Sequence, residues 1–225
     1  MNLKMVATTM VALTFACNTQ AQSHVLQVNT KKAVAPVQPT MYGLFFEDIN
    51  YAADGGLYGE LIKNRSFEFP QPLMGWQTFG HVTVENDGPF ERCPHYVTLA
   101  YPGHRERRSG LVNEGYFGIG VLKGEDYRFS VWAKAPNGEA RIKVQLIDEG
   151  TLEERQDFAT AHIDINSNEW KRYEVKIHSP KTDNKARLRI FLEGQQPVSL
   201  ERISLFPVNT FRNRTNGMRR DLGQA

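Results

Sequence analysis

The feature that most constrains the fold is a strict alternation of apolar and polar side chains in the second half of the chain. Every second residue from Ile142 to Leu146 is apolar, and the residues between them are Lys and Gln. The segments 172–177 and 186–192 repeat the pattern. Successive side chains of a β-strand point to opposite faces, so each segment is expected to form a strand with one buried face.

Several shorter apolar runs between residues 73 and 207 carry the same indication, and turn residues separate them. Pro136-Asn137-Gly138 and Asp148-Glu149-Gly150 supply such turns. The other candidate strands are Val82–Val84, Tyr96–Ala100, Tyr116–Val121, Tyr127–Ala133 and Leu200–Phe206. About eight strands in this segment predict a mainly β fold, a jelly-roll β-sandwich over residues 73–207.

The residues before Pro70 follow a different pattern of apolar and polar side chains. Met41–Phe46 is continuously apolar, as in a parallel strand that is buried on both faces, and Glu47 and Asp48 end it. Apolar residues at helical spacing then predict a helix over 57–65. Adjacent strand residues face opposite sides, so Glu47 and Asp48 are not by themselves an acid/base pair. One of them faces a ligand, or both are solvated loop carboxylates; the pattern leaves both alternatives open.

This stretch resembles the start of the catalytic domain of family 51 α-L-arabinofuranosidases. The matching motifs are Phe45-Phe46-Glu47, Asp54-Gly55-Gly56-Leu57-Tyr58 and Asn64-Arg65-Ser66-Phe67-Glu68. The resemblance implies that residues 22–72 form an N-terminal strand and the first β/α unit of a (β/α)8 barrel. It also implies that Glu47 hydrogen-bonds arabinofuranose and positions the substrate without cleaving a bond.

The resemblance resumes in the run 210–225, which implies that residues 208–225 start the next barrel helix. The sandwich is then an insertion in an incomplete barrel. In the family, two later glutamates act as acid/base and nucleophile, and neither motif is present in this sequence. Retaining hydrolysis needs both carboxylates, so no catalytic residue is assigned and the chain alone is expected to be inactive.

The sandwich segment resembles carbohydrate-binding modules of xylanases and cellulases, through 124–134 and the closing 198–206. Such modules bind sugars on exposed aromatic rings. Trp132 shares the polar side of its strand with Arg128, Ser130 and Lys134, so it is the first candidate platform, followed by Trp76, Tyr101 and Trp170. The alternative is that Trp132 covers the second face of the sandwich or docks against the barrel.

Met1–Ala21 has an early Lys4 and an apolar run that is too short to span a bilayer, which predicts an export signal. Cleavage after Ala21 and lipid attachment at Cys17 are both open. The protein is therefore expected to be exported, either to the periplasm, to the outside of the cell, or to the outer membrane as a lipoprotein. Without Cys17, Cys93 is the one remaining thiol in the sequence and has no intrachain partner.

Charge and composition exclude other classes. The formal net charge of +2 is distributed without a basic block, so nucleic acid is not an expected partner. The histidines lack metal-ligand spacing, and no cofactor motif is present, so neither a metal nor a cofactor is expected.

Two functions from different classes follow. In the first, the chain is the N-terminal portion of a secreted retaining α-L-arabinofuranosidase that releases arabinofuranose from hemicellulose or pectin. In the second, it is a free-standing carbohydrate-binding protein. In both, the partner is an arabinose-containing polysaccharide or oligosaccharide. A third possibility treats the sandwich as a structural spacer.

Overall fold

The computed structural model describes residues 25–31, 35–36, 38, 41, 47–103, 108–150 and 156–223. The chain divides into two compact units, Met1–Phe45 and Phe46–Ala225. The predicted export signal, Cys17 and all but Met41 of the predicted apolar strand 41–46 lie outside the described residues. No helix in the described parts of the chain is long and apolar enough to cross a membrane.

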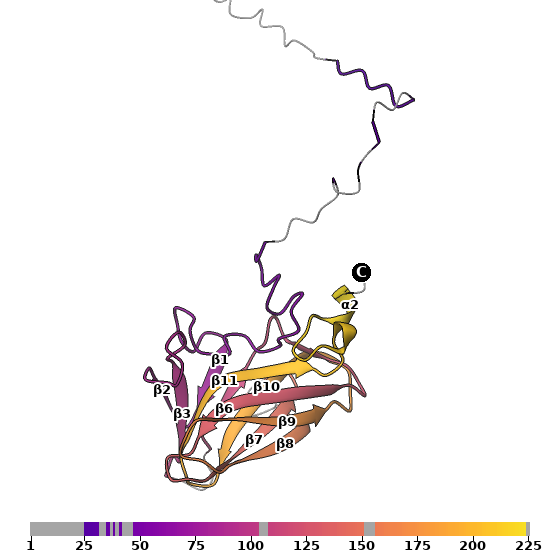
Figure 1. Ribbon diagram of the computed structural model, residues 1–225. Helices are drawn as coiled ribbons and strands as arrows, with labels where there is room; N and C mark the ends of the chain where they lie inside the picture. The colour runs from indigo at the N-terminus through magenta and orange to yellow at the C-terminus, as the bar shows by residue number, and fades with distance from the viewer. Residues whose placement is uncertain are drawn as a thin grey trace, which may run out of the picture. The chain divides into compact units, whose positions relative to one another are not determined.

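The second unit is a β-sandwich of two antiparallel sheets, which confirms the predicted mainly β fold (Figure 1). The first sheet has the order β1-β4-β10-β7-β8, with β5 paired to β10. Its strands are β1 (Trp76–Phe79), β4 (Gly110–Asn113), β5 (Ile119–Val121), β7 (Ala140–Ile147), β8 (Asp157–Ile165) and β10 (Asp183–Glu193). The second sheet has the order β2-β3-β11-β6-β9. Its strands are β2 (His81–Glu85), β3 (Tyr96–Ala100), β6 (Asp126–Lys134), β9 (Lys171–His178) and β11 (Val198–Pro207).

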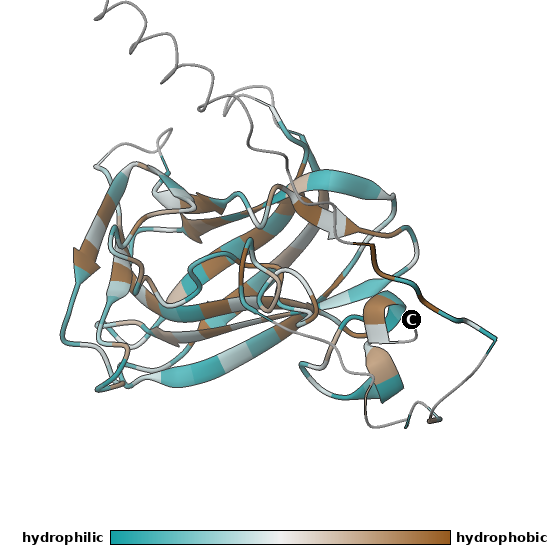
Figure 2. Ribbon diagram, turned by 90° about the horizontal axis from the view of Figure 1, so that it is seen from above, coloured by the Kyte–Doolittle hydropathy of each residue, from teal (hydrophilic) through white to brown (hydrophobic). Residues whose placement is uncertain are grey.

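The alternating segments form strands with the predicted buried faces. Every second residue of β7 from Ile142 to Leu146 is fully buried, and so is every second residue of β10 from Ala186 to Ile190. These side chains meet those of the second sheet in one core. Figure 2 shows the corresponding alternation of hydrophobic and hydrophilic residues along the strands.

Three strands were not predicted, and one was predicted too long. All four residues of β4 are buried, so this strand has no alternation to detect. β1 has four residues, and the inner face of β8 carries alanines, a weak apolar signal. The predicted strand 116–121 is reduced to β5, because Gly115, Phe117 and Gly118 have positive φ and make a tight turn before Ile119.

The predicted helix over 57–65 is wrong. This segment is turn and extended chain, and its backbone groups bond to both sheets instead of to each other. The Leu61 amide donates to the Leu205 carbonyl at 3.0 Å. On the other side, the Lys63 amide donates to Asn113 Oδ1 at 3.2 Å. These tertiary hydrogen bonds replace the local ones that a helix needs, which overrides the helical spacing of its leucines.

We call residues 59–67 the strap, because they close the edge of the sandwich between the two sheets. Ile62 and Phe67 of the strap are fully buried in the core. The Glu60 carboxylate accepts hydrogen bonds from Ser204 Oγ at 2.6 Å and from the Leu205 amide at 3.0 Å. The Asn64 carbonyl accepts the Trp76 Nε1 hydrogen bond at 3.0 Å, which ties the strap to β1.

The entry and exit of the sandwich lie side by side. Tyr58 forms an antiparallel bridge with Met218, and the Arg219 amide donates to the Leu57 carbonyl at 2.9 Å. The exit segment carries the 3-10 turn η2 (Phe211–Asn213) and one helical turn, α2 (Arg220–Gly223), near the C-terminus (Figure 1). Whether α2 opens a barrel helix stays a prediction, as do the barrel itself and the predicted domain limits.

Glu201 of β11 is an unusual buried carboxyl. Its side chain is fully buried, and neither oxygen makes a hydrogen bond of normal geometry within the described residues, although Ser66 and the Arg202 amide lie close enough to favour the charged form. The nearest cation is Arg202, whose Nε lies 3.6 Å from Glu201 Oε1. Burial raises the pKa of this carboxyl to about 8, because the charged form loses its hydration.

A pH-dependent stability follows from Glu201. A carboxyl whose pKa is higher in the folded state stabilises the fold below its unfolded pKa, about 4.3, and this stabilisation is lost as the pH rises toward 8. Urea unfolding should show a free energy of unfolding that falls by at most about 1.4 kcal/mol per pH unit for this group. Burial also raises the pKa of Glu60, which adds a decline of the same sign.

Glu201→Gln should flatten this decline and leave the variant more stable than the wild type at pH 8. Glu139→Gln, which changes an exposed carboxyl, is the matched control and should follow the wild type. Parallel pH profiles for wild type and Glu201→Gln would show that the Glu201 carboxyl does not titrate in this range.

Candidate functional site

The outer faces of the two sheets differ in how far they are covered. On the second sheet, the strap and the loop 86–95 cover the face, and side chains that point outward are nevertheless buried. These are Tyr96, Ser130, Ser199, Glu201, Ser204 and Phe206, none of them more than 6% exposed. On the first sheet, the outward residues of β8 (Thr160, His162 and Asp164) are exposed. The second sheet is also exposed along β9, at Arg172, Glu174 and Lys176, and Gln145 and Phe191 in the middle of the first sheet are buried. The two faces therefore differ in the strap and the loop that lie over the second sheet.

Trp132 and Trp170 lie on the covered face. As predicted, Trp132 shares the outer side of β6 with Lys134, while Val131 and Ala133 face the core. The Phe90 ring packs edge-on against Trp132, with centroids 5.1 Å apart, and Trp170 packs edge-on against Tyr96 at 5.0 Å. Both tryptophans keep only an intermediate exposure, so covering the second sheet accounts for much of their surface.

Trp76 is not available as a sugar platform. Its side chain is 6% exposed and packs against Phe67, with ring centroids 5.4 Å apart. Its indole N–H is used by the strap. Trp76 was a candidate because a sugar-binding face needs exposed aromatic rings, but the edge of the sandwich closes over it.

The open face of the first sheet presents polar side chains in three rows across β10, β7 and β8. The strand register aligns them as Arg189, Gln145 and Thr160, as Phe191, Lys143 and His162, and as Glu193, Arg141 and Asp164. Gln145 Oε1 accepts from Arg189 Nε at 2.9 Å, and Gln145 Nε2 donates to Thr160 Oγ1 at 3.0 Å. We call this set of residues the open face.

Phe191 is the aromatic centre of the open face. Its ring is 3% exposed, because Arg108, Lys143 and Arg189 lie around it at 4.6, 5.5 and 5.9 Å from the ring centroid. Cations over an aromatic ring are favourable, so the ring holds these three donors in place. The result is an apolar floor under a layer of hydrogen-bond donors.

Glu193 is the principal acceptor of the open face. Its carboxylate contacts His162 Nδ1 at 2.7 Å, Lys143 Nζ at 3.3 Å and Arg141 Nε at 3.9 Å. Partial burial alone would raise its pKa, but the hydrogen bonds from His162 and Lys143 outweigh burial and hold the pKa below its ordinary value. Glu193 is therefore ionised at neutral pH and fixed in orientation.

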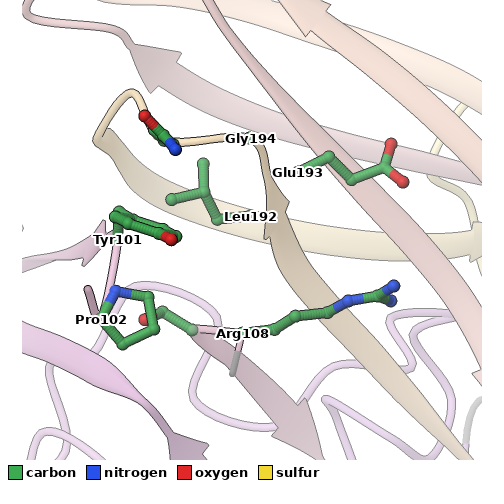
Figure 3. Close-up of a pocket in the computed structure, with 8 residues that line it drawn as sticks. Tyr101, Pro102, Arg108, Leu192, Glu193 and Gly194 are labelled. Atoms are coloured by element: carbon green, nitrogen blue, oxygen red, sulfur yellow. The ribbon is translucent and has the colours of Figure 1, made fainter. Parts of the chain in front are cut away.

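A cavity of about 280 Å³ adjoins this carboxylate. Figure 3 shows Tyr101 and Pro102 on one side of it, and Arg108 and Glu193 reaching in the same direction from neighbouring segments. Of the four aromatic residues predicted from sequence, Tyr101 is the one that the fold brings to this cavity. Glu47 belongs to another part of the chain, the loop before Tyr51, where it is exposed.

The chemistry of the open face suits binding more than catalysis. Its groups donate and accept hydrogen bonds around an apolar ring and an adjoining tyrosine, as expected for a neutral polyhydroxylated ligand. In the described parts of the chain, no group of three His, Cys, Asp or Glu residues could hold a metal ion.

Sequence reasoning missed most of this site. Arg141, Lys143 and Gln145 were recognised as the polar side of a strand, opposite its buried side, and were not proposed as a site. Their signal was the alternation itself, but the partners that complete the rows come from β8 and β10, which only strand pairing brings together. Glu193 carried no motif, and Arg108 belongs to the charged run 105–108, which the sequence indicated as a solvated loop or strand edge.

The comparisons with known proteins relate this chain to a carbohydrate binding domain and to arabinofuranosidases. A family model described as a carbohydrate binding domain matches residues 59–198. The extracellular exo-α-L-arabinofuranosidase of Streptomyces chartreusis is 39% identical over 201 residues, which cover 84% of this chain and 22% of that protein. α-L-Arabinofuranosidase 1 of Arabidopsis thaliana is 28% identical over 206 residues, which cover 84% of this chain and 30% of that protein.

A solved structure has a similar fold over most of this chain. The arabinose-bound MgGH51 α-L-arabinofuranosidase superposes with a TM-score of 0.70 at 27% identity, over 81% of this chain and 32% of that one. The chain thus spans between about a fifth and a third of the length of these relatives.

The ion-pair geometry of the open face can be tested by titration. In Lys143→Met, Glu193 loses a cation, so its carboxyl pKa should rise from its lowered value toward the ordinary one. Carbon-detected NMR of the glutamate carboxyls measures the midpoint. Lys176→Met, which removes a lysine paired with Asp126 on the second sheet, is the control and should leave Glu193 unchanged. An unaltered Glu193 midpoint in Lys143→Met would contradict the pairing.

Proposed function

The chain belongs to the carbohydrate binding domain family, and from this premise we propose that its sandwich binds a glycan across the open face of the first sheet. The observation that carries the proposal is the contrast between the two faces. The strap and the loop 86–95 lie over the middle of the second sheet and leave Arg172, Glu174 and Lys176 of β9 exposed, while the first sheet presents ordered rows of donors and acceptors across β10, β7 and β8.

The open face and the adjoining cavity beside Tyr101 together offer a sugar two kinds of contact. Tyr101 supplies the edge or face of a ring for the C–H groups of a sugar. Arg108 and Glu193 line the same cavity but extend away from Tyr101 (Figure 3), and they supply a donor and an acceptor for hydroxyls on that side. Glu193 is already held by His162 and Lys143, so little ordering is needed on binding. The relatives support an arabinose-containing polysaccharide or oligosaccharide as the ligand.

We further propose that the chain is the N-terminal portion of a retaining α-L-arabinofuranosidase. The identity to arabinofuranosidases over 84% of the chain supports this, and so do the motifs around Glu47. Glu47 is then the residue that positions arabinofuranose. In this proposal the chain is exported, as is the Streptomyces chartreusis relative by its description, with cleavage after Ala21 or a lipid at Cys17.

A free-standing carbohydrate-binding protein is the second candidate. It is favoured by the way the sandwich closes on itself, with entry and exit bridged through Tyr58 and Met218 and a core contained within the second unit. The two candidates share the open face and differ in whether the chain acts as part of a longer glycosidase polypeptide.

Glycan binding should depend on the open face. Glu193→Ala and Tyr101→Ala should each weaken binding of soluble arabinoxylan or arabinan about tenfold or more, which corresponds to about 1.4 kcal/mol, because each removes a direct contact. Affinity electrophoresis and calorimetry measure the loss. Trp132→Ala is the matched aromatic truncation on the second sheet and should bind as the wild type does. Loss of binding in Trp132→Ala with retention in the other two would move the site to the second sheet.

Hydrolysis tests the expectation that this chain is inactive alone. The chain should not cleave 4-nitrophenyl α-L-arabinofuranoside, because retaining hydrolysis needs two carboxylates about 5 Å apart and the resemblance assigns neither to this sequence. The arabinofuranosidase of Streptomyces chartreusis serves as the positive control. Turnover by this chain would overturn the assignment of Glu47 as a positioning residue alone.

A further inference from the structure

A second cavity, of about 600 Å³, lies where the chain enters and leaves the sandwich. Loop residues 55–61, the turn before β5, the start of β10 and the exit segment all contribute to it. Tyr58, Tyr116, Leu122 and Tyr127 give it largely aromatic and aliphatic walls. It shares no lining residue with the cavity beside Tyr101.

Exposed apolar side chains gather at its rim. Phe117 is 77% exposed and Leu122 is 58% exposed, and both line the cavity. Leu222, 44% exposed, follows the lining residue Asp221, and Ile49, 55% exposed, belongs to the loop of Tyr51. The Tyr51 and Phe117 rings are in contact, with centroids 5.8 Å apart. A clustered exposed apolar patch usually marks a surface that another molecule covers.

Two aromatic residues of this patch have a strained backbone conformation. Phe117 has φ of +61° and Tyr51 has φ of +63°, a conformation that side chains larger than glycine rarely adopt. Gly115 and Gly118, also with positive φ, flank Phe117 and allow the tight turn that holds its ring outward. Strain that places an aromatic ring in solvent points to a function for the ring.

The charged groups near the rim are already satisfied within the chain. Arg219 pairs with Asp221, and Arg220 Nη1 donates to Asn209 Oδ1 at 3.1 Å. A partner therefore does not need to supply charges here. An apolar protein surface fits better than an anionic or cationic ligand.

The place of the patch identifies the partner. Both connections of the sandwich to other parts of a polypeptide pass through it, since Tyr58 bridges Met218 and Arg219 bonds to Leu57. In the relatives, most of the polypeptide lies beyond the matched region, because the match covers 22% of one and 30% of another. The covalent connections would bring that remainder to this end of the sandwich.

We propose that Phe117, Leu122, Leu222 and the walls of this cavity, together called the end surface, dock against the remainder of a family 51-type glycosidase polypeptide. The inference rests on the arabinofuranosidase part of the proposed function and is independent of glycan binding. The end surface then fixes the orientation of the sandwich on its host domain, and the closed strand edges let it do so as a preformed unit.

Two measurements on the whole chain test this. First, the chain should enhance the fluorescence of 1-anilinonaphthalene-8-sulfonate, and Phe117→Ser combined with Leu122→Lys should remove most of the enhancement. Second, the part of the Streptomyces chartreusis relative outside the matched region, added in trans after circular dichroism shows it folded, should bind the wild type at least tenfold more tightly than the double variant. Met74→Lys is the control, since Met74 is 38% exposed but does not line the cavity.

Three results would overturn the docking proposal. They are dye binding that is equal in wild type and double variant, equal affinity of both for the folded fragment, and sedimentation that shows the wild type as a dimer broken by the double substitution. The last result would make a second copy the occupant. Arabinoxylan binding by the double variant, expected to equal that of the wild type, distinguishes failure of this inference from failure of the glycan-binding proposal.

Discussion

The strap is the connection on which the rest of the sandwich depends. A sandwich of two sheets leaves edges where backbone groups and core side chains meet water, and residues 59–67 close one of these edges. Glu60 bonds to β11 while Lys63 bonds to Asn113 of β4, so a single segment joins both sheets. Ile62 and Phe67 fill the space between them. Burial of Glu60 is tolerated because its carboxylate accepts hydrogen bonds from Ser204 and from backbone amides.

The strap also explains why the two faces of the sandwich serve different purposes. Together with the loop 86–95 it occupies the second sheet, where it buries Tyr96 and Phe206 and leaves Trp132 and Trp170 partly covered. The outer face of the first sheet has no such cover over its β8 side, so Thr160, His162 and Asp164 remain accessible. The proposed glycan site and the end surface are then separate regions with separate chemistry, one polar and one apolar.

Similar chemistry would not be expected at both regions. On the open face, three cations around Phe191 and a fixed Glu193 make a surface that exchanges hydrogen bonds with water until a hydroxylated ligand replaces them. At the end surface, Phe117 and Leu122 gain from contact with another apolar surface, which excludes water. A glycosidase portion that both holds polysaccharide and docks on a host domain would need both kinds of region.

The sequence by itself determined the class of the fold and the buried faces of β6, β7, β9 and β10, because alternation of side chains is a local property of a strand. It also indicated the kinship with arabinofuranosidases, through motifs around Glu47 that are contiguous in the chain. It did not reveal β4, whose residues are buried on both faces, or the strap, whose helical spacing was overridden by hydrogen bonds to Leu205 and Asn113.

Only the tertiary structure decided which polar and aromatic residues act together. Trp76 and Trp132 were both candidate platforms from the sequence, but the closed edge buries the first and Phe90 packs on the second. Glu193, His162 and Arg141 are far apart in the chain, and strand register makes them neighbours. The physical reason is that alternation sets the direction of each side chain within its strand, while its neighbours depend on long-range pairing and on what covers the sheet.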